Sequence, residues 1–415
     1  MLLALQGTQP FLPLLGSWLE LDGLSTIVVY LSLGSFLVLV WASIGSGQGA
    51  DSFVLGLLFS ISVIALVSVS NMLAFYVAWE IVGLSCWGLG KWGVGLRSRL
   101  TGALPFNAAG ALASLCMFVA VMLLAWENRT LEMKTLKMTD TELVPALLLG
   151  AVLLKSFGIL GHAWHPADGR SFSVSQAILA SGGLAAVGLY PYLRFFHYVL
   201  VMPDSTEWSE TTFFVALGLA LVMGVAALGE VDSHRLLTLG SFGQFSWVIA
   251  LLSLRGDRLV DGAVLGGLTY ALSYAGLFLC LGIVESATGK RVLRVEGGAL
   301  RSMPLVAVLF WLLATSAVGL PPLGGFVSAL LVTDELSDTG RIVMVFSLAA
   351  MALVSFLYLL RLFAGLFLGK QLASVAPRGA FFSVVAVLVL VGGLGWVSLY
   401  PGAVLEWVQF LHLKG

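Results

Sequence analysis

Long runs of apolar residues constrain the fold of this 415-residue chain more than any other feature. A helix needs about 20 mostly apolar residues to cross the ~30 Å hydrocarbon core of a bilayer. Twelve runs of suitable length lie near residues 24–46, 52–69, 71–91, 103–126, 143–163, 172–199, 211–229, 235–256, 261–285, 303–333, 341–368 and 379–401. Because a backbone in lipid must satisfy its hydrogen bonds internally, the sequence predicts an all-α polytopic membrane protein with about 12 transmembrane helices in a single domain, residues 1–415.

Two of these runs exceed one membrane span and contain helix-breaking residues. Run 303–333 is interrupted by Gly-Leu-Pro-Pro-Leu-Gly-Gly at 319–325, and 172–199 contains weaker breakers. Non-helical backbone at membrane depth is tolerated where it is buried in protein or lines a cavity. We therefore expect each run to form a discontinuous helix, with the clearer break at 319–325.

Composition narrows the functional classes. Hydrophobic residues make up 59% and charged residues 10%, against about 25% charged residues in a soluble domain. The net charge of −1 argues against nucleic acid as a partner. Three cysteines lie in apolar runs without metal-ligand spacing, and the chain has no nucleotide-binding fingerprint. We expect no cofactor, no metal site and no catalytic centre within the chain itself. The first residues lack a basic n-region, so we expect the first helix to direct insertion.

The distribution of basic residues between loops predicts the topology. Twelve spans place Lys91, Arg97, Arg99, Arg170, Arg235, Lys290, Arg291, Arg294, Arg301, Lys370 and Arg378 on one side, and Arg129, Lys134, Lys137, Arg255, Arg258, Arg341 and Lys414 on the other. The richer side is expected to face the cytoplasm. Both termini are then non-cytoplasmic, in a bacterial cytoplasmic (inner) membrane.

Two ionisable residues of opposite sign lie inside apolar runs, Glu80 and Lys155. An ionisable group at the bilayer centre costs about 2.5 kcal/mol or more on insertion scales, so it faces protein or water and is commonly functional. The alternative is that each reaches the interface or forms a structural pair. Burial disfavours the charged form of either group alone, whereas close approach stabilises both charges. Such a pair can switch between two positions and pass on a proton.

Other residues are weaker candidates for a proton path. His162 follows Lys155 by two helical turns on the same face, and His165 is nearly one turn further. Both could instead form hydrogen bonds within the turn that ends the helix. His234 begins another helix, where a solvated polar cluster is ordinary. Tyr270 and Tyr274, one turn apart, would line a polar path or simply pack.

The order of several motifs resembles the antiporter-like, proton-translocating membrane subunits of respiratory complex I, Mrp-type sodium/proton antiporters and membrane-bound hydrogenases. The matching residues are Asp22-Gly23-Leu24-Ser25, Trp79-Glu80, Asn107 with Gly110, Lys155-Ser156, His162-Ala163-Trp164 with Pro166, Tyr190 to Arg194, Asp232, Arg235, Leu237, Gln244, Met303-Pro304, and Gly319-Leu320-Pro321-Pro322 through Gly325-Phe326-Val327-Ser328.

This resemblance implies two inverted five-helix repeats, at about 52–199 and 211–368, each with a broken helix, followed by a C-terminal helix at about 379–401. It gives Glu80 and Lys155 the role of the family's coupling pair. The chain also departs from the family pattern, because ionisable or characteristic positions are occupied by Ala108, Ala111, Ser173, Ala186, His234, Tyr270, Tyr274 and Ala329. The first half of the proton path thus keeps its pair, while the central and exit half has lost most of its charge.

The favoured interpretation is a proton-conducting or proton-coupling subunit of a larger membrane complex. The losses suggest a divergent paralogue that couples the proton gradient to a zinc-binding, carbonic-anhydrase-like partner in bicarbonate (inorganic carbon) uptake. The alternatives are an antiporter-like subunit of a complex I, hydrogenase or Mrp-type complex, and a scaffold that transports nothing. An autonomous sodium/proton antiporter is disfavoured because the chain has few intramembrane carboxylates.

Overall fold

The computed structural model describes residues 22–43, 50–90, 104–137, 142–160, 174, 177–199, 206–254, 256–288, 293, 298–369 and 380–412. The described parts are helical, without a β-strand. The helices are α1 (Gly23–Ser43), α2 (Ala50–Ser68), α3 (Met72–Gly90), α5 (Leu104–Asn128), α6 (Leu143–Leu160), α8 (Tyr190–Leu193), α9 (Thr206–Gly229), α10 (Ser233–Ser253), α11 (Asp257–Thr288), α12 (Pro304–Val318), α13 (Gly324–Asp338), α14 (Ile342–Phe367), α15 (Ala380–Leu399) and α16 (Pro401–His412).

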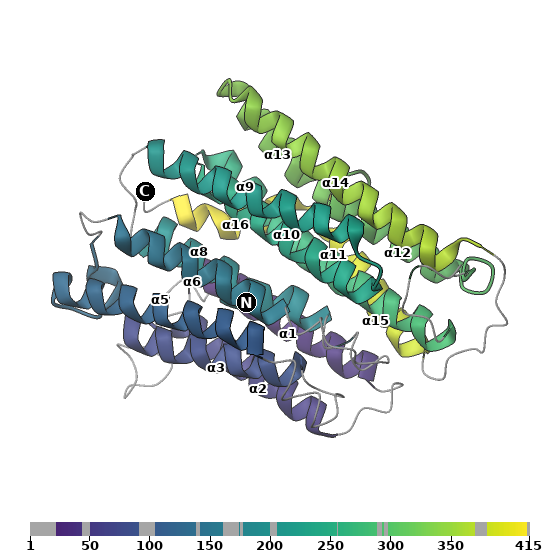
Figure 1. Ribbon diagram of the computed structural model, residues 1–415, viewed down its shortest axis with the longest axis horizontal. Coiled ribbons are helices and arrows are strands. Elements are labelled where there is room, and N and C mark those ends of the chain that lie inside the picture. Colours follow the sequence, from purple (N-terminus) through teal and green to yellow (C-terminus); the bar gives the residue numbers. More distant parts are fainter. Residues whose placement is uncertain are drawn as a thin grey trace.

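The helices form one bundle with their axes roughly aligned (Figure 1). Helices α1, α2, α3, α5, α6 and α8 lie on one side, and α9 to α14 on the other. Helix α10 is the most enclosed, because all of its residues except Arg235 are buried. It is also rich in Ser, Thr, Gly and Gln, whereas the helices facing outward are strongly apolar. A polar helix is favoured at the centre of a bundle in lipid, where its side chains find protein partners.

The expected membrane character is confirmed. Eight helices in the described part are long and apolar enough to cross a membrane, and three shorter apolar helices accompany them. Every one of the twelve predicted runs contains at least one helix of the structure. Twelve spans are not established, since the shorter helices fall below the usual spanning length. The chain is therefore an all-α integral membrane protein.

The predicted break at 319–325 is present. Helix α12 ends at Val318, its C-cap Gly319 adopts a left-handed φ of 86°, and α13 begins at Gly324. The intervening Pro321–Pro322 peptide is cis. Proline cannot donate a backbone hydrogen bond, and glycine adopts positive φ without a steric penalty, so this sequence ends one helix and starts another.

The other long run does not form a comparable break within its described part. Residues 177–199 are continuously helical, but much of this segment is wide π-helix: η4 (Leu179–Gly183), η5 (Ala185–Leu189) and η6 (Arg194–Val199) flank or precede α8. Wide turns alter the direction of side chains and occur often at functional sites. Here they carry Gly188, where an added Cβ would lie 2.2 Å from the Phe245 ring and 2.6 Å from the Ser156 hydroxyl.

Candidate functional site

Lys155 and Glu80 meet inside the bundle. Lys155 Nζ on α6 lies 2.9 Å from both carboxylate oxygens of Glu80 on α3 and 3.0 Å from the Ser114 hydroxyl on α5. An ammonium group has three N–H donors, and three acceptor atoms surround this one. The lysine side chain is only 7% exposed. The charge is thus held by three helices within a buried, fully coordinated arrangement.

Two residues of α3 shape the space around the lysine. The Nζ atom lies 4.4 Å from the centroid of the Trp79 ring, within the range of a cation–π interaction. The indole nitrogen of Trp79 donates to the carbonyl of Val187 at 3.1 Å, which fixes the ring against the π-helical segment. Gly83, one turn beyond Trp79, has no side chain to compete with Lys155 for room.

Glu80 differs from its partner in exposure. Its side chain is 29% exposed, and it borders an apolar outer face that includes Ile81 and Leu84. A carboxylate at membrane depth that faces the outside of the chain is costly in lipid. A neighbouring protein surface or water would relieve this cost.

Tyr270 and Tyr274, on α11, lie beside Ser241 in the middle of α10. The hydroxyls of Tyr274 and Tyr358 are hydrogen-bonded, and Gln244 Nε2 donates to Ser355 at 2.6 Å. A small cavity of about 30 Å³ beside them is lined by Ser181, Leu184, Ala185, Leu189, Ser241, Phe245, Val248, Gly267, Tyr270, Ala271 and Tyr274. This volume accommodates one water molecule, and the lining includes four hydroxyl-bearing residues, Ser181, Ser241, Tyr270 and Tyr274. The two tyrosines therefore line a small, mostly apolar cavity as well as packing.

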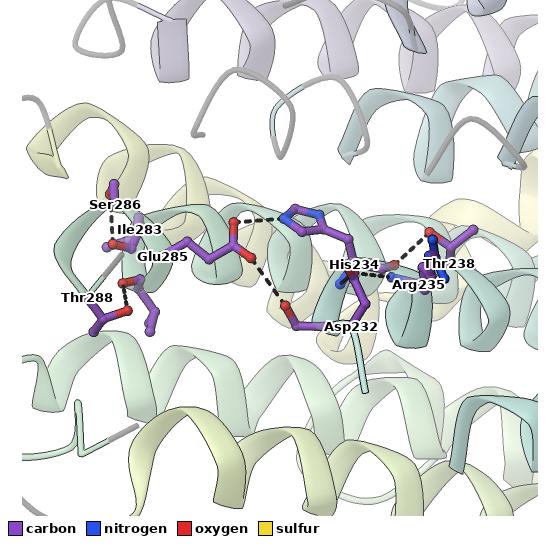
Figure 2. A network of polar contacts seen from close by, with 10 residues as sticks. Asp232, His234, Arg235, Thr238, Ile283, Glu285, Ser286 and Thr288 are labelled. Atoms are coloured by element: carbon purple, nitrogen blue, oxygen red, sulfur yellow. Dashed lines mark hydrogen bonds and ion pairs between the residues drawn. The ribbon is translucent and has the colours of Figure 1, made fainter. Parts of the chain in front are cut away.

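His234 is fully buried and has a partner that sequence reasoning missed. Its Nε2 lies 2.8 Å from Glu285 Oε2, and Ser233 donates to the other oxygen at 3.2 Å (Figure 2). Glu285 lies near the end of the apolar run 261–285, where we gave it no role. The signal was present, since an acidic residue at the end of α11 comes close to the start of α10 when the two helices are antiparallel. The second half thus retains one buried ionisable pair.

Two predicted site residues remain. His162 and His165 lie outside the described residues. Among the described residues, no group of three or more His, Cys, Asp or Glu side chains could hold a metal ion.

An unpredicted ion pair joins the start of α1 to Arg194, the first residue of η6. Arg194, buried at 5% exposure, contacts Asp22 at 2.5 Å, and Asp22 also accepts from the backbone N–H of Ser25. The pair connects residues far apart in the chain and ties the first described helix to the bundle. Because it joins two segments that are distant in the sequence, a structural role is favoured.

A larger cavity of about 400 Å³ lies away from these ionisable groups. Helices α1, α11, α15 and α16 and the π-helical segment enclose it, and most of its lining is apolar, with Tyr30, Ser35 and Ser181 among the few polar side chains. Enclosed volume alone does not identify a site for proton chemistry, which needs titratable groups. We therefore place the candidate site at Lys155 and Glu80.

Comparison with known proteins shows the family of this chain. The model of the family "NADH:quinone oxidoreductase/Mrp antiporter, TM" matches residues 69–355, which is more than half of the chain. This range contains Glu80, Lys155, His234 and Glu285. The chain belongs to this family of antiporter-like membrane subunits.

Individual relatives are distant but cover most of the chain. NAD(P)H-quinone oxidoreductase chain 4 1 of Synechococcus elongatus is 28% identical over 92% of this chain and 74% of its own length. NADH-ubiquinone oxidoreductase chain 4 of Chondrus crispus is 23% identical over 94% of this chain and 81% of its own. These identities are too low to transfer an individual function.

Solved structures show the same fold. A chain of the Mrp complex from Dietzia sp. DQ12-45-1b superposes with a TM-score of 0.82 at 18% identity, covering 94% of this chain and 83% of that one. A chain of respiratory complex I from Thermus thermophilus gives 0.74 at 22% identity, covering 97% and 90%. Both structures are of multi-subunit complexes.

Proposed function

We propose that this chain is a proton-conducting or proton-coupling subunit of a larger membrane complex, and that Lys155 and Glu80 are its central proton-holding pair. The observation that carries the proposal is the placement of Lys155 Nζ between two Glu80 oxygens and the Ser114 hydroxyl. Movement of the flexible lysine head towards or away from Glu80 changes the stability of its charge. That change is what a proton-transfer step requires.

The partial exposure of Glu80 supports assembly with other subunits. In isolation, the carboxylate borders the exposed apolar residues Ile81 and Leu84, at 48% and 67% exposure. A neighbouring subunit on this face would bury those side chains and supply polar partners to Glu80. The proposed complex thus completes the site as well as holding the chain in place.

Proton flux through the assembled protein tests this function. The complex isolated through a tag on this chain would be placed in liposomes, with a potassium gradient and valinomycin to impose a potential and a pH-sensitive dye to report protons. We expect K155A and E80Q each to lower the flux about tenfold or more, as loss of an acid–base group does elsewhere. The exposed Asp334, paired with Arg258 at 2.6 Å, provides a control. D334N should conduct normally, and unchanged flux in both K155A and E80Q would exclude the proposal.

For the partner, we propose a zinc-binding, carbonic-anhydrase-like protein that takes part in inorganic carbon uptake. The support is the loss of ionisable residues from the central and exit part of the family's proton path, at Ala186 and Ala329 among others. A shortened path suits delivery or removal of one proton at a partner's active site better than long-range pumping. Mass spectrometry and zinc analysis of the purified complex test this assignment. A partner with flavin or quinone chemistry would instead indicate a respiratory complex, a hydrogenase or an Mrp-type assembly.

A scaffold without transport is the remaining alternative. Its support is the same loss of charge, and the Lys155–Glu80 pair argues against it.

We further propose two inverted repeats, about 52–199 and 211–368, with the helix at about 379–401 outside them. The proposed location is a bacterial inner membrane with both termini non-cytoplasmic. Cysteine labelling of single-cysteine variants from each side of sealed vesicles tests that orientation.

A further inference from the structure

The pair formed by His234 and Glu285 is unusual in its burial. The histidine side chain is 0% exposed and the glutamate 8%, yet their ring nitrogen and carboxylate oxygen are 2.8 Å apart. Replacing a buried ion pair by apolar residues is often neutral or stabilising. Stability alone is therefore a weak reason for this chain to contain the pair, and ionisable residues inside membrane proteins commonly belong to proton relays.

The charged groups around the pair are engaged by neighbouring backbone. Asp232 caps α10 by accepting the N–H groups of His234 and Arg235. Glu230 accepts the N–H groups of Val231 and Asp232. From α14, Arg361 donates to the carbonyl of Leu228 at the end of α9. Arg235 is partly exposed.

Around Glu285 itself, the polar neighbours on α11 bond within their own helix. Ser286 donates to the carbonyl of Ile283 and Thr288 donates to that of Val284 (Figure 2). Among the described residues, Glu285 hydrogen-bonds to the side chains of His234 and Ser233. Within the described residues, the carboxylate and the imidazole are thus in direct contact at this end of the bundle.

A series of polar side chains extends from this pair towards the centre of the second half. Thr238 and Ser241 follow His234 by one and two turns of α10, and both are buried. On the antiparallel helix α11, Tyr274 lies deeper than Glu285 and lines the 30 Å³ cavity together with Ser241. The hydroxyls of Thr238 and Ser241 donate to carbonyls of α10, so their lone pairs remain able to accept hydrogen bonds.

We propose that His234 and Glu285 together form a second proton-binding site, at the end of the bundle where α10 begins and α11 ends. The site holds one exchangeable proton. Either an imidazolium faces a carboxylate, or a neutral imidazole faces a carboxylic acid, and only N–H and O–H bonds form or break. The proton exchanges in two directions. One leads to the outside of the bundle at this end, and the other leads along the hydroxyls of Thr238 and Ser241 to Tyr274. The transport part of this proposal rests on the proposed function.

Infrared spectroscopy tests proton binding without any transport. Difference spectra of the purified full chain in nanodiscs would be recorded across a pH titration. We expect a protonated-carboxyl band that disappears in E285Q and shifts in H234Q. If the carboxyl bands of E285Q and H234Q are both the same as those of wild type, the proposal is overturned, whatever the flux assay shows.

Transport by a neutral version of the pair tests its role. The double variant H234Q/E285Q keeps two amide groups that can hydrogen-bond but removes the exchangeable proton, and its melting temperature and elution profile show whether it folds. We expect about tenfold lower flux in the double variant. The single variant E285D, which keeps a carboxyl group, should conduct at nearly the rate of wild type. If the double variant folds and conducts like wild type while K155A does not, the second site is excluded and the proposed function stands. If K155A and E80Q both conduct normally, the proposed function fails.

If H234Q/E285Q does not fold, E285D and the single variant E285Q give the decision. E285D keeps the acid and should conduct, whereas E285Q should not. Equal flux in these two variants, at matched melting temperatures, would contradict a proton-binding role for Glu285. The exposed variant D334N again serves as the control for loss of a carboxylate.

Discussion

A Cβ atom on Gly83 would lie 2.7 Å from Cε and 3.2 Å from Nζ of Lys155. Such a separation is shorter than real Cβ contacts, so the lysine side chain occupies space that only glycine leaves open at this position. Because the contact involves the far end of a flexible side chain, the lysine can move when this space is filled. Gly83 therefore determines where the lysine head rests.

This relationship predicts that G83A changes function more than stability. The added methyl group should displace Lys155 Nζ from Glu80 while costing less than about 1 kcal/mol in free energy of unfolding, since alanine favours a helix. We expect a clear fall in proton flux with a melting temperature close to that of wild type. G110A is a matched control, because an added Cβ there meets no atom within 4 Å. Normal flux in a folded G83A protein would contradict this role of Gly83.

Comparison of K155M and E80Q with the double variant K155M/E80Q should distinguish the effect of the Lys155–Glu80 pair on stability from its effect on proton flux. Loss of one partner from a buried pair costs about 3–5 kcal/mol, and we expect about 2–3 kcal/mol here because Glu80 is 29% exposed. K155M and E80Q should each lower the melting temperature, whereas K155M/E80Q should recover much of the loss, because no unpaired charge remains. Flux should stay low in all three. Recovery of flux in the double variant would show that the pair is structural.

Trp79 offers a test of how the lysine is positioned. W79F keeps an aromatic face for Lys155 but removes the indole N–H that donates to Val187 at 3.1 Å. We expect a loss of about 1 kcal/mol in the free energy of unfolding, typical of one hydrogen bond, with modest loss of flux. W79L also removes the cation–π contact and should lower flux further. Similar flux in W79F and W79L would mean that the ring face contributes nothing to the site.

The predictable features were those that local sequence determines. Apolar length predicted membrane helices, and the Gly and Pro residues at 319–325 predicted the break between α12 and α13, because both depend on nearby residues alone. The association of Glu80 with Lys155 was a reasonable expectation from opposite intramembrane charges, and the geometry shows them in contact. The role of that contact in transport remains a proposal.

Tertiary context determined the features that sequence reasoning missed. Glu285 looked like an ordinary acidic residue at a helix end, and only the antiparallel packing of α10 and α11 brings it to His234. Arg194 lies near a helix end, where a long basic side chain commonly reaches the interface. In the structure it is buried against Asp22, whose place in the bundle no local pattern specifies. Wide π-helical turns within 177–199 likewise have no simple sequence signature.

The break between α12 and α13 gives a final prediction about stability. A Cβ on Gly325 would lie 1.9 Å from the carbonyl oxygen of Ser316, and backbone on both sides leaves little room to move. G325A should therefore cost at least about 3 kcal/mol, at the upper end for overpacking. Gly340 has a φ of 67°, and no atom lies within 4 Å of an added Cβ there. A substitution at Gly340 therefore tests backbone strain without a steric clash. G340A should cost only about 1–2 kcal/mol, the usual penalty for a left-handed residue. Melting temperatures of the purified variants check the order, and equal values for G325A and G340A would show that the two half-helices can separate freely at this point.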